Sequence, residues 1–516
     1  MFASSKPKIR TRTVSVKKAV PDKPHDVQRK PTQAQSLNGA TNGSRKPASV
    51  APPANRYSLT TTNKVRSSAA QPHAGRKSLS VPRVQQRKRK ATPSTPQIWA
   101  SSDESSSEED SDRLGAGLRK RQKTSSSIEP MATNRCLEPD LKRRIRLQDG
   151  VPQQNGVATG KEAKKPAKLI HGLKMSRGEW VKDFKPAFTG SEESPVVELQ
   201  YPSSSAPERF ETVIPRDNSN FNPLDDIYFS IEEIIQHYLP PELSAELSSD
   251  MTGPVRLLKR AVAKNAPEDF KKALNDFNDT IRSKVSDKTI PNVLDSMHAI
   301  PLSLTKRILA QVYQRTVSPH VHLLRKVMDK DTTYGELLPP FIHNVFHQTR
   351  LSSQKVFVDL GSGVGNVVLQ SALQTGAESW GIEILPQPAN FALAQASELR
   401  ARAKLWNINL GPIRLLEGSF LESPEIDVVL SRADVVLVNN KVFHPTLNDK
   451  LLCKFLDLKQ GCKIVSLESF GGGGKQGVRN EQSIANLFDE ERFESGTNSV
   501  SWAGESVEYF IATKTR

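Results

Sequence analysis

The residues best suited to chemistry lie within VFVDLGSGVGNVVLQSAL, residues 356–373. Here three glycines, Gly361, Gly363 and Gly365, alternate with other residues between an apolar run and an apolar, helix-like segment. A glycine-rich turn between a strand and a helix lets a ligand approach the bare backbone. The segment DLGSGVGN therefore predicts a ligand-binding loop, and its spacing limits the ligand.

The spacing of the glycines argues against the two commonest ligands of such loops. A Walker loop places Lys and then Ser or Thr after its glycines, whereas Asn366 and two valines follow Gly365. The dinucleotide fingerprint has glycines at its first, third and sixth positions, but here they stand at the first, third and fifth. Asp359 precedes them, and a carboxylate repels a pyrophosphate but attracts an ammonium group. S-adenosylmethionine carries an ammonium and a sulfonium and no phosphate, so we expect a methyl-donor site.

Two later strand ends support a nucleoside ligand. Glu383 lies near the end of the expected strand WGIEI (380–384), 24 residues after Asp359. An acid at the end of the second strand accepts hydrogen bonds from ribose hydroxyls, which both NAD and S-adenosylmethionine possess, so Glu383 does not choose between them. Ser419 and Phe420 end the next run, where an adenine ring can stack on an aromatic side chain.

The strand DVVLVNN ends in the residues best placed to hold a methyl acceptor, Asn439 and Asn440. Methyl transfer needs a nucleophile held in line with the sulfonium carbon in a dry cavity. An amide carbonyl can orient an amine, and aromatic walls exclude water and tolerate positive charge. Phe443, Trp502 and Tyr509 are candidates for such walls, although ordinary core packing explains each of them as well.

From residue 355 onward, strands alternate with helices. This pattern predicts an α/β fold with a doubly wound, mostly parallel sheet, whose ligand lies at the carboxyl ends of the strands. A closing hairpin at 499–514 would add antiparallel strands. The other expected strands are 356–360, 380–384, 414–420, 434–440 and 462–470, and the expected helices are 366–375, 390–406 and 445–458.

A helical lobe is expected before this core, at residues 195–345. Its apolar residues recur every three or four positions, as on one face of a helix. Helices are expected at 225–239, at 267–285, where Phe270, Leu274, Phe277 and Ile281 share that spacing, and at 300–327, with a break at Pro319.

The first 194 residues are rich in Ser, Pro, Lys and Arg and show no sustained hydrophobic period. Residues 1–190 contain 39 Lys and Arg against 15 Asp and Glu, a net charge of +24, while 191–516 carry −7, which gives +17 for the chain. This composition predicts a disordered basic arm on a mildly acidic body. Its clusters RKRK (87–90), RKRQK (119–123) and LKRRIR (141–146) favour nuclear import and nucleic-acid contact, while the acidic serine run 101–112 is expected to be solvated.

Several other protein classes are excluded. The three cysteines, Cys136, Cys453 and Cys462, have unrelated spacings that fit neither a disulfide framework nor a Cys-based zinc site, and we expect no metal. No apolar run approaches the length of a membrane span, and the N-terminus lacks the apolar core of a signal peptide. We therefore expect a soluble, intracellular protein that does not contact membranes.

Taken together, the motifs resemble those of a known family. YGEL (334–337), VDLGSGVGN (358–366), EGSF (417–420), LVNN (437–440) and SVSW…EYF (499–510) are similar, in this order, to the catalytic core of the disruptor-of-telomeric-silencing methyltransferases. The resemblance covers about 195–516, and the long preceding arm resembles fungal members. It implies a class I, seven-stranded S-adenosylmethionine-dependent methyltransferase core at 346–516, which acts on lysine 79 of histone H3 in nucleosomes.

The family also implies roles for individual residues. It implies a donor-binding loop of Tyr334, Gly335, Glu336 and Leu337, and a cradle of Phe357, Val358, Asp359, Leu360, Gly361, Ser362, Gly363, Val364, Gly365 and Asn366. It further implies ribose binding by Glu383, adenine contacts from Ser419 and Phe420, amine positioning by Asn439, and a lysine channel lined by Phe443, Trp502 and Tyr509.

The partners implied by the resemblance are those of a chromatin enzyme. They are the core surface of histone H3, nucleosomal DNA through the basic arm, ubiquitinated histone H2B, and the acidic patch of the nucleosome through Arg479. The family also implies a nuclear location and roles in chromatin regulation, telomeric silencing and the DNA-damage checkpoint.

A basic arm that would serve RNA as well as DNA, and two departures from the family pattern, leave rival functions open. Lys441 stands where the family usually has an aromatic residue, and GGGG (471–474) replaces bulkier residues. One rival is a methyltransferase that acts on RNA or on another basic protein. The other is a nucleosome-binding scaffold with little or no catalytic activity.

Overall fold

The computed structural model describes residues 135–147, 168–190, 194–217, 221–325, 335–470 and 484–516. All of these described residues belong to one unit. Within these described ranges, no helix is both long enough and apolar enough to cross a membrane.

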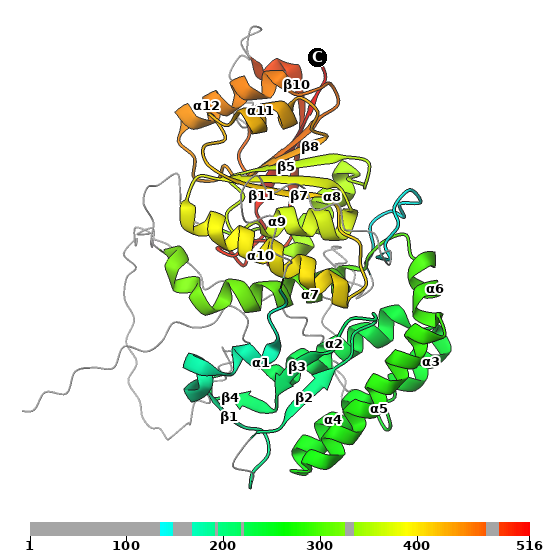
Figure 1. Cartoon of the computed structure of the whole chain (residues 1–516). Helices are drawn as coiled ribbons and strands as arrows, with labels where there is room; N and C mark the ends of the chain where they lie inside the picture. Colours follow the sequence, from blue (N-terminus) through cyan, green and yellow to red (C-terminus); the bar gives the residue numbers. More distant parts are fainter. Residues whose placement is uncertain (1–134, 148–167, 191–193, 218–220, 326–334, 471–483) are drawn as a thin grey trace, which may run out of the picture. The chain divides into compact units, whose positions relative to one another are not determined.

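A seven-stranded sheet forms the C-terminal part, as the sequence predicted (Figure 1). Its strands lie in the order β10-β11-β9-β8-β5-β6-β7. β5 to β9 are parallel, and β11 runs antiparallel to both of its neighbours, β9 and β10, so that β10 runs in the same direction as β5 to β9. The chain leaves β5 first toward β6 and later toward β8, which makes the carboxyl end of β5 the switch point where doubly wound sheets bind ligands. The strands are β5 (Val356–Leu360), β6 (Glu378–Glu383), β7 (Ile413–Glu417), β8 (Val435–Val438), β9 (Lys463–Ser466), β10 (Phe488–Glu494) and β11 (Glu508–Lys514).

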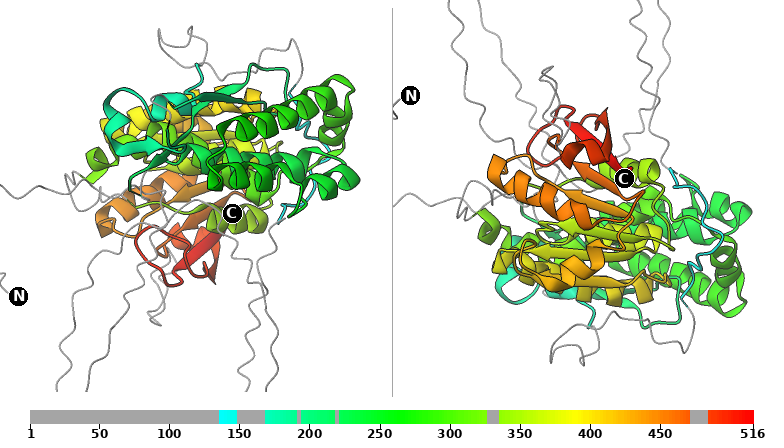
Figure 2. Two further views of the ribbon diagram at one scale, coloured as in Figure 1. Left: turned by 90° about the horizontal axis from the view of Figure 1, so that it is seen from below. Right: turned by 90° about the horizontal axis from the view of Figure 1, so that it is seen from above.

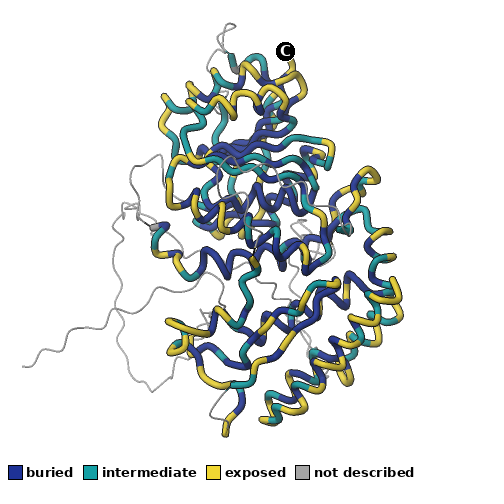
Figure 3. The backbone as a smooth tube through the Cα atoms, in the orientation of Figure 1, coloured by how far each residue is buried: buried dark blue, intermediate teal, exposed yellow. Residues whose placement is uncertain are grey.

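Alternate residues of the central strands face two separate cores. Phe357 and Leu437 pack with α8, α9 and α10, whereas Val358 and Val436 pack with α11 and α12. Figure 1 shows these two groups of helices on opposite faces of the sheet, and Figure 3 shows the buried strands between them. The first group comprises α8 (Pro339–Thr349), α9 (Asn366–Gln370) with the π-helix η5 (Ser371–Thr375), and α10 (Pro386–Leu405), and the second comprises α11 (Pro424–Leu430), α12 (Pro445–Lys454) and η6 (Phe455–Asp457).

The helical lobe precedes the sheet, and its predicted helices are confirmed. Phe270, Leu274, Phe277 and Ile281 are buried along one face of α5. The lobe also contains two short antiparallel strand pairs, β1 with β4 and β2 with β3, whose three or four residues are too few to produce a visible period. Its elements are α1 (Gly172–Met175), η2 (Gly178–Asp183), β1 (Phe184–Pro186), β2 (Val196–Leu199), β3 (Glu208–Glu211), β4 (Val213–Pro215), α2 (Pro223–Tyr238), α3 (Pro241–Leu247), α4 (Pro254–Ala263), α5 (Pro267–Ser286), α6 (Thr289–Ser296), α7 (Leu302–Thr316) and η3 (Ser318–Arg325).

Many prolines of this chain start helices. The helices α2, α3, α4, α5, α8, α10, α11 and α12 all begin at a proline. At the first helical position the fixed φ of proline suits the helix, and the missing N–H would have had no helical acceptor. Proline in the folded part therefore defines helix boundaries, although a high proline content by itself is typical of disorder.

The closing hairpin differs from the prediction. β11 pairs with β10, where Phe493 lies opposite Tyr509, and not with residues near 499. The strand β10 lies at the edge of the sheet, in the C-terminal part of the chain drawn in red tones in Figure 2. Its sequence, FDEERFE, contains five charged residues because most residues of this edge strand are not buried. An alternating hydrophobic pattern could not reveal such a strand. Val500 instead forms isolated bridges with Leu337 and Ala503.

Part of the predicted arm is folded, so the boundary at residue 194 is wrong for 135–147 and 168–190. Arg143, within LKRRIR, is 8% exposed, and its guanidinium donates to the backbone carbonyls of Leu373 (2.7 Å) and Gln374 (2.5 Å). Carbonyls in the last turn of a helix have no N–H donor within the helix, and here the Arg143 guanidinium donates the hydrogen bonds in its place. Arg143 is therefore a structural residue and not a nucleic-acid contact. The other two basic clusters lie outside the described residues.

Candidate active site

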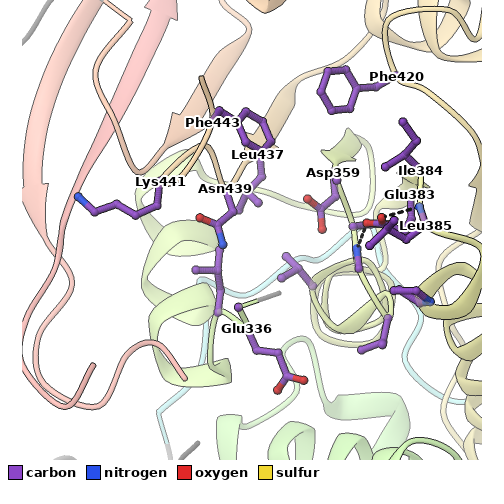
Figure 4. A pocket seen from close by; sticks show the side chains of 18 of the residues that line it. Glu336, Asp359, Glu383, Ile384, Leu385, Phe420, Leu437, Asn439, Lys441 and Phe443 are labelled. Atoms are coloured by element: carbon purple, nitrogen blue, oxygen red, sulfur yellow. Dashed lines mark hydrogen bonds between the residues drawn. The ribbon is translucent and has the colours of Figure 1, made fainter. Parts of the chain in front are cut away.

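A cavity of about 750 Å³ lies at the carboxyl ends of β5, β6 and β8, beside the switch point of the sheet (Figure 4). This volume is typical of a site for a small ligand. The cavity is lined by Gly335, Glu336, Leu337, Asp359, Gly361, Ser362, Gly363, Val364, Asn366, Val367, Glu383, Ile384, Leu385, Pro388, Ser419, Phe420, Leu421, Leu437, Asn439, Lys441, Val442, Phe443, Leu447 and Trp502.

The glycine-rich loop forms one wall of the cavity. Gly361 has a φ of +88°, which residues with side chains rarely adopt, and a Cβ there would meet nothing within 4 Å. Its N–H donates to the carbonyl of Ile382 at 3.0 Å, which ties the loop to the end of β6. At Gly365, with a φ of +83°, a Cβ would lie 3.1 Å from the Cβ of Ala392 on α10. The first glycine thus opens the backbone to the cavity, and the last lets two helices approach.

Two carboxylates, those of Asp359 and Glu383, lie beside the loop. Glu383 accepts hydrogen bonds from the backbone N–H groups of Gly363 (2.8 Å) and Leu385 (2.9 Å). Asp359 is 3% exposed, and no described residue donates a hydrogen bond to its side chain. Burial and the nearby charge of Glu383 raise the pKa of Asp359 to about 8, and burial also raises the pKa of Glu383 against the opposing effect of its hydrogen bonds. This pair is suited to a cationic ligand.

An apolar wall lies next to Glu383. The rings of Phe420 and Phe443 stack, with centroids 6.3 Å apart and planes inclined by 27°. Ile384 is 54% exposed although its side chain is large and apolar, because it faces the cavity. Figure 4 shows Phe420 and Ile384 at the same end of the cavity as Glu383. An apolar surface beside a hydrogen-bond acceptor suits the planar base and the ribose of a nucleoside.

The YGEL and SVSW motifs, far apart in the sequence, form a common wall. The Glu336 N–H donates to Ser501 Oγ, and the Ser501 N–H donates to the Glu336 carbonyl, both at 2.9 Å. The Glu336 carboxylate accepts a hydrogen bond from the Tyr313 hydroxyl at 2.8 Å. A Cβ on Gly335 would lie 2.6 Å from the ring of Trp502, so only glycine permits this approach.

The adjacent asparagines after β8 have opposite environments. Asn440 is fully paired: its Oδ1 accepts from the backbone N–H groups of Leu467 (3.0 Å) and Glu468 (2.9 Å), and its Nδ2 donates to the Glu468 carbonyl and to Asn448 Oδ1, both at 3.1 Å. The buried Oδ1 of Asn439 has no hydrogen-bond partner in the described part of the chain, although the residue lines the cavity. An unpaired buried acceptor costs about 1–3 kcal/mol, which a ligand that brings a donor would recover.

Fifteen of the residues predicted to form the site line this cavity. They are Gly335, Glu336, Leu337, Asp359, Gly361, Ser362, Gly363, Val364, Asn366, Glu383, Ser419, Phe420, Asn439, Phe443 and Trp502. Phe357, Val358 and Leu360 do not, because their side chains belong to the cores on the two faces of the sheet. Gly365 packs against α10, and Tyr334 lies outside the described residues.

Tyr509 also lies outside the cavity lining, contrary to the expectation that it lines a lysine channel. Its ring packs edge-on against Phe341 and stacks on Phe493, and it is 1% exposed. Its hydroxyl donates to Gln348 Oε1 at 2.6 Å. The alternative weighed for this aromatic residue, core packing, is the arrangement observed.

Sequence reasoning missed most of the apolar lining. The additional residues are Val367, Ile384, Leu385, Pro388, Leu421, Leu437, Val442 and Leu447, together with Lys441. Val367 and Ile384 directly follow a polar residue that was predicted, and Leu421 and Val442 adjoin a predicted aromatic residue. Ile384 and Leu385 come just after β6, and this position was an available signal, because an apolar residue just beyond a strand of a doubly wound sheet faces the ligand crevice.

These features fit S-adenosylmethionine. The unpaired carboxylate of Asp359 suits an ammonium group, Glu383 suits ribose hydroxyls, and the wall at Phe420 suits adenine. Among the residues that the structure describes, no cluster of three or more His, Cys, Asp or Glu side chains could hold a metal ion.

Comparison with known families and proteins agrees with this site. Residues 313–514 match the family model "Histone methylation protein DOT1". The chain is 42% identical over 444 residues to the "Histone-lysine N-methyltransferase, H3 lysine-79 specific" of Aspergillus fumigatus, an alignment that covers 86% of this chain and 84% of that protein. It is also 42% identical over 384 residues to the protein of the same name from Emericella nidulans, covering 74% and 75% of the two chains.

Among solved structures, a putative class I S-adenosylmethionine-dependent methyltransferase from Listeria monocytogenes aligns with a TM-score of 0.32 and 11% identity. The alignment covers 57% of this chain and 88% of that one. So weak an overlap carries no conclusion, and the fold assignment rests on the strand order of the sheet.

Proposed function

The chain belongs to the histone methylation protein DOT1 family, and from this premise we propose that it transfers methyl groups from S-adenosylmethionine to lysine 79 of histone H3. The observation that carries the proposal is that one cavity contains uncompensated carboxylates and, apart from them, an unpaired amide carbonyl. Asp359 and Glu383 lack a cation at one end, and the Asn439 carbonyl lacks a donor at the other. A cationic methyl donor and an amine would satisfy both.

The donor end is built to hold the cofactor without a metal. When bound, S-adenosylmethionine supplies an electrophilic methyl group on its sulfonium. Asp359 would pair with the ammonium group, and the positive φ at Gly361 leaves the backbone open to the ligand. Glu383, already oriented by two backbone hydrogen bonds, would accept from the ribose hydroxyls, and Ser419 and Phe420 would flank the adenine.

The acceptor end is built to present a neutral amine. The Asn439 Oδ1 would accept a hydrogen bond from the lysine amine and so orient its lone pair. Phe443 and Trp502 would exclude water, which favours the uncharged, nucleophilic form of the amine. No described residue has to act as a metal ligand, since direct displacement at a sulfonium carbon needs positioning and a dry site.

The partners of such an enzyme follow from the charge distribution. Residues 1–134, which precede the folded segment, carry 26 Lys and Arg against 9 Asp and Glu, a net charge of +17. They would hold nucleosomal DNA through its phosphates and keep the enzyme on chromatin in the nucleus. Contacts of Arg479 with the nucleosome acidic patch and of the chain with ubiquitinated histone H2B belong to the same proposal, as do roles in telomeric silencing and the DNA-damage checkpoint.

A tritiated methyl-transfer assay on nucleosomes, free histone H3 and total RNA tests this function. We expect label on H3 within nucleosomes and its loss in Asn439→Ala, with donor affinity measured by calorimetry nearly unchanged. The control is Asn292→Ala, the same substitution at an exposed position of α6, which should transfer like the wild type. Label on RNA would move the substrate to another class, and donor binding without label on any substrate would favour the scaffold.

A further inference from the structure

An ion pair stands at the edge of the proposed active site. Lys441 lines the cavity two residues after Asn439, and its ammonium pairs with the carboxylate of Glu468. Both side chains are partly open to solvent, 43% and 47% exposed. Figure 4 shows Lys441 on the far side of Asn439 from Asp359, so the pair lies at the acceptor end and not at the donor end.

Hydrogen bonds from the side chain of Asn440 fix the backbone at Glu468. The side chain of Asn440 accepts from the Leu467 and Glu468 N–H groups and donates to the Glu468 carbonyl. Asn440 is 1% exposed and is itself braced by Asn448. Three consecutive residues after β8 therefore act on neighbouring groups. Asn439 lines the cavity, Asn440 fixes the backbone of Glu468, and Lys441 pairs with the Glu468 carboxylate.

From this arrangement, which rests on the proposed function, we infer that the Lys441–Glu468 pair sets the charge of the lysine entrance and so determines how well a cationic substrate enters. A lone Lys441 would place a positive charge where the target lysine arrives, together with a basic histone surface. Glu468 cancels that charge. Because the pair is solvent-exposed, it contributes little to stability, and its effect is on substrate entry.

Removal of either charge of the Lys441–Glu468 pair should change substrate entry, in opposite directions for the two residues. Removal of the carboxylate in Glu468→Gln leaves a cation at the entrance, which repels the substrate. Removal of the cation in Lys441→Met leaves a carboxylate, which attracts it. Solvent screens charges at this exposed position, so we expect roughly a threefold fall in kcat/KM for nucleosomes in Glu468→Gln and roughly a threefold rise in Lys441→Met.

The experiment measures kcat/KM for nucleosomes and Kd for the donor at two salt concentrations. The variants are Glu468→Gln, Lys441→Met, and the double charge swap Lys441→Glu with Glu468→Lys, which should return toward the wild-type value. Both shifts should shrink at high salt, and donor affinity should stay within twofold throughout. Glu268→Gln, in the exposed pair with Lys271 on α5, is the matched control and should change nothing.

The outcomes separate this inference from the proposed function. Opposite shifts with rescue by the swap support it. Shifts of the same sign in both single variants would show that the pair merely holds the 467–468 segment, and would overturn the inference while leaving the methyltransferase intact. Absence of transfer to H3 by the wild-type chain would overturn the proposed function and this inference with it.

Discussion

Buried carboxylates occur in two regions of this molecule, and they differ in whether the surrounding residues neutralise their charge. Between the lobe and α10, Glu208 is fully buried and meets the guanidinium groups of Arg315 (2.8 Å) and Arg402 (2.9 Å), a backbone N–H at Gly172 and the hydroxyl of Tyr201. In the cavity, Asp359 is 3% exposed and has no such partner among the described residues.

The titration of the two acids follows their surroundings. Burial alone would raise the pKa of Glu208, but Arg315 and Arg402 lower it far below its ordinary range. Burial and Glu383 raise the pKa of Asp359 to about 8. A buried charge that has oppositely charged partners within the chain has a structural role. A buried charge without such partners in a cavity indicates a ligand of opposite charge. The predictions below test this distinction.

The largest effect is expected in the compensated region. Glu208→Gln would leave Arg315 and Arg402 buried without their shared counter-ion, which typically costs about 3–5 kcal/mol. We therefore expect the free energy of unfolding, measured by urea denaturation, to fall by that amount. Glu268→Gln, which breaks an exposed pair on α5, should cost less than about 1 kcal/mol. Equal losses in the two variants would show that the buried cluster is no more important than a surface pair.

A smaller effect of a different kind is expected in the cavity. Asp359→Asn removes the charge proposed to pair with the donor ammonium, and a hydrogen bond between charged groups contributes about 1.5–3 kcal/mol. Calorimetry should therefore show a loss of donor affinity of roughly 10- to 100-fold. Stability should not fall, because no described residue depends on that carboxylate.

Asp250→Asn, the same change at an exposed position, is the control and should leave both quantities unchanged. If Asp359→Asn lowered stability as Glu208→Gln does, the contrast between the two regions would be lost. If donor affinity were unchanged, Asp359 would not be the partner of the ammonium group.

The sequence was sufficient for the local parts of the site. The glycine loop, Asp359 and Glu383 are recognisable because strand, turn and helix follow one another directly, and the chemistry depends on spacing of a few residues. The parallel direction of β5 to β9 likewise follows from alternating strands and helices.

Features that depend on distant segments were not predictable. Asn439 and Asn440 are the same residue type, and only the position of Leu467 and Glu468 makes one a brace and leaves the other unpaired. Lys441 was recognised only as a departure from the family pattern, because its partner, Glu468, lies 27 residues away in the sequence. Arg143 belonged to a cluster typical of nucleic-acid contact until its carbonyl acceptors were known.

The last expected difference concerns the pH dependence of stability. Burial and the charge of Glu383 raise the pKa of Asp359 from its ordinary value of 3.8 to about 8, so the native state binds more protons than the unfolded state between these pH values. Stability must then fall as pH rises through this window, by at most about 1.4 kcal/mol per unit for one proton. Urea denaturation midpoints at pH 5, 6, 7 and 8 should show that the stability of Asp359→Asn rises relative to that of the wild type as the pH increases.

Glu208 predicts the opposite sign. Its pKa is lowered on folding, so its contribution is present above the unfolded value near 4.5 and is lost only as the pH falls below it. Between pH 5 and 8, the difference in unfolding free energy between the wild type and Glu208→Gln should therefore stay nearly constant. Over the same range, the wild type should lose stability relative to Asp359→Asn. Parallel profiles for all three proteins would mean that Asp359 is ionised throughout and already compensated, and that its cavity does not await a cation.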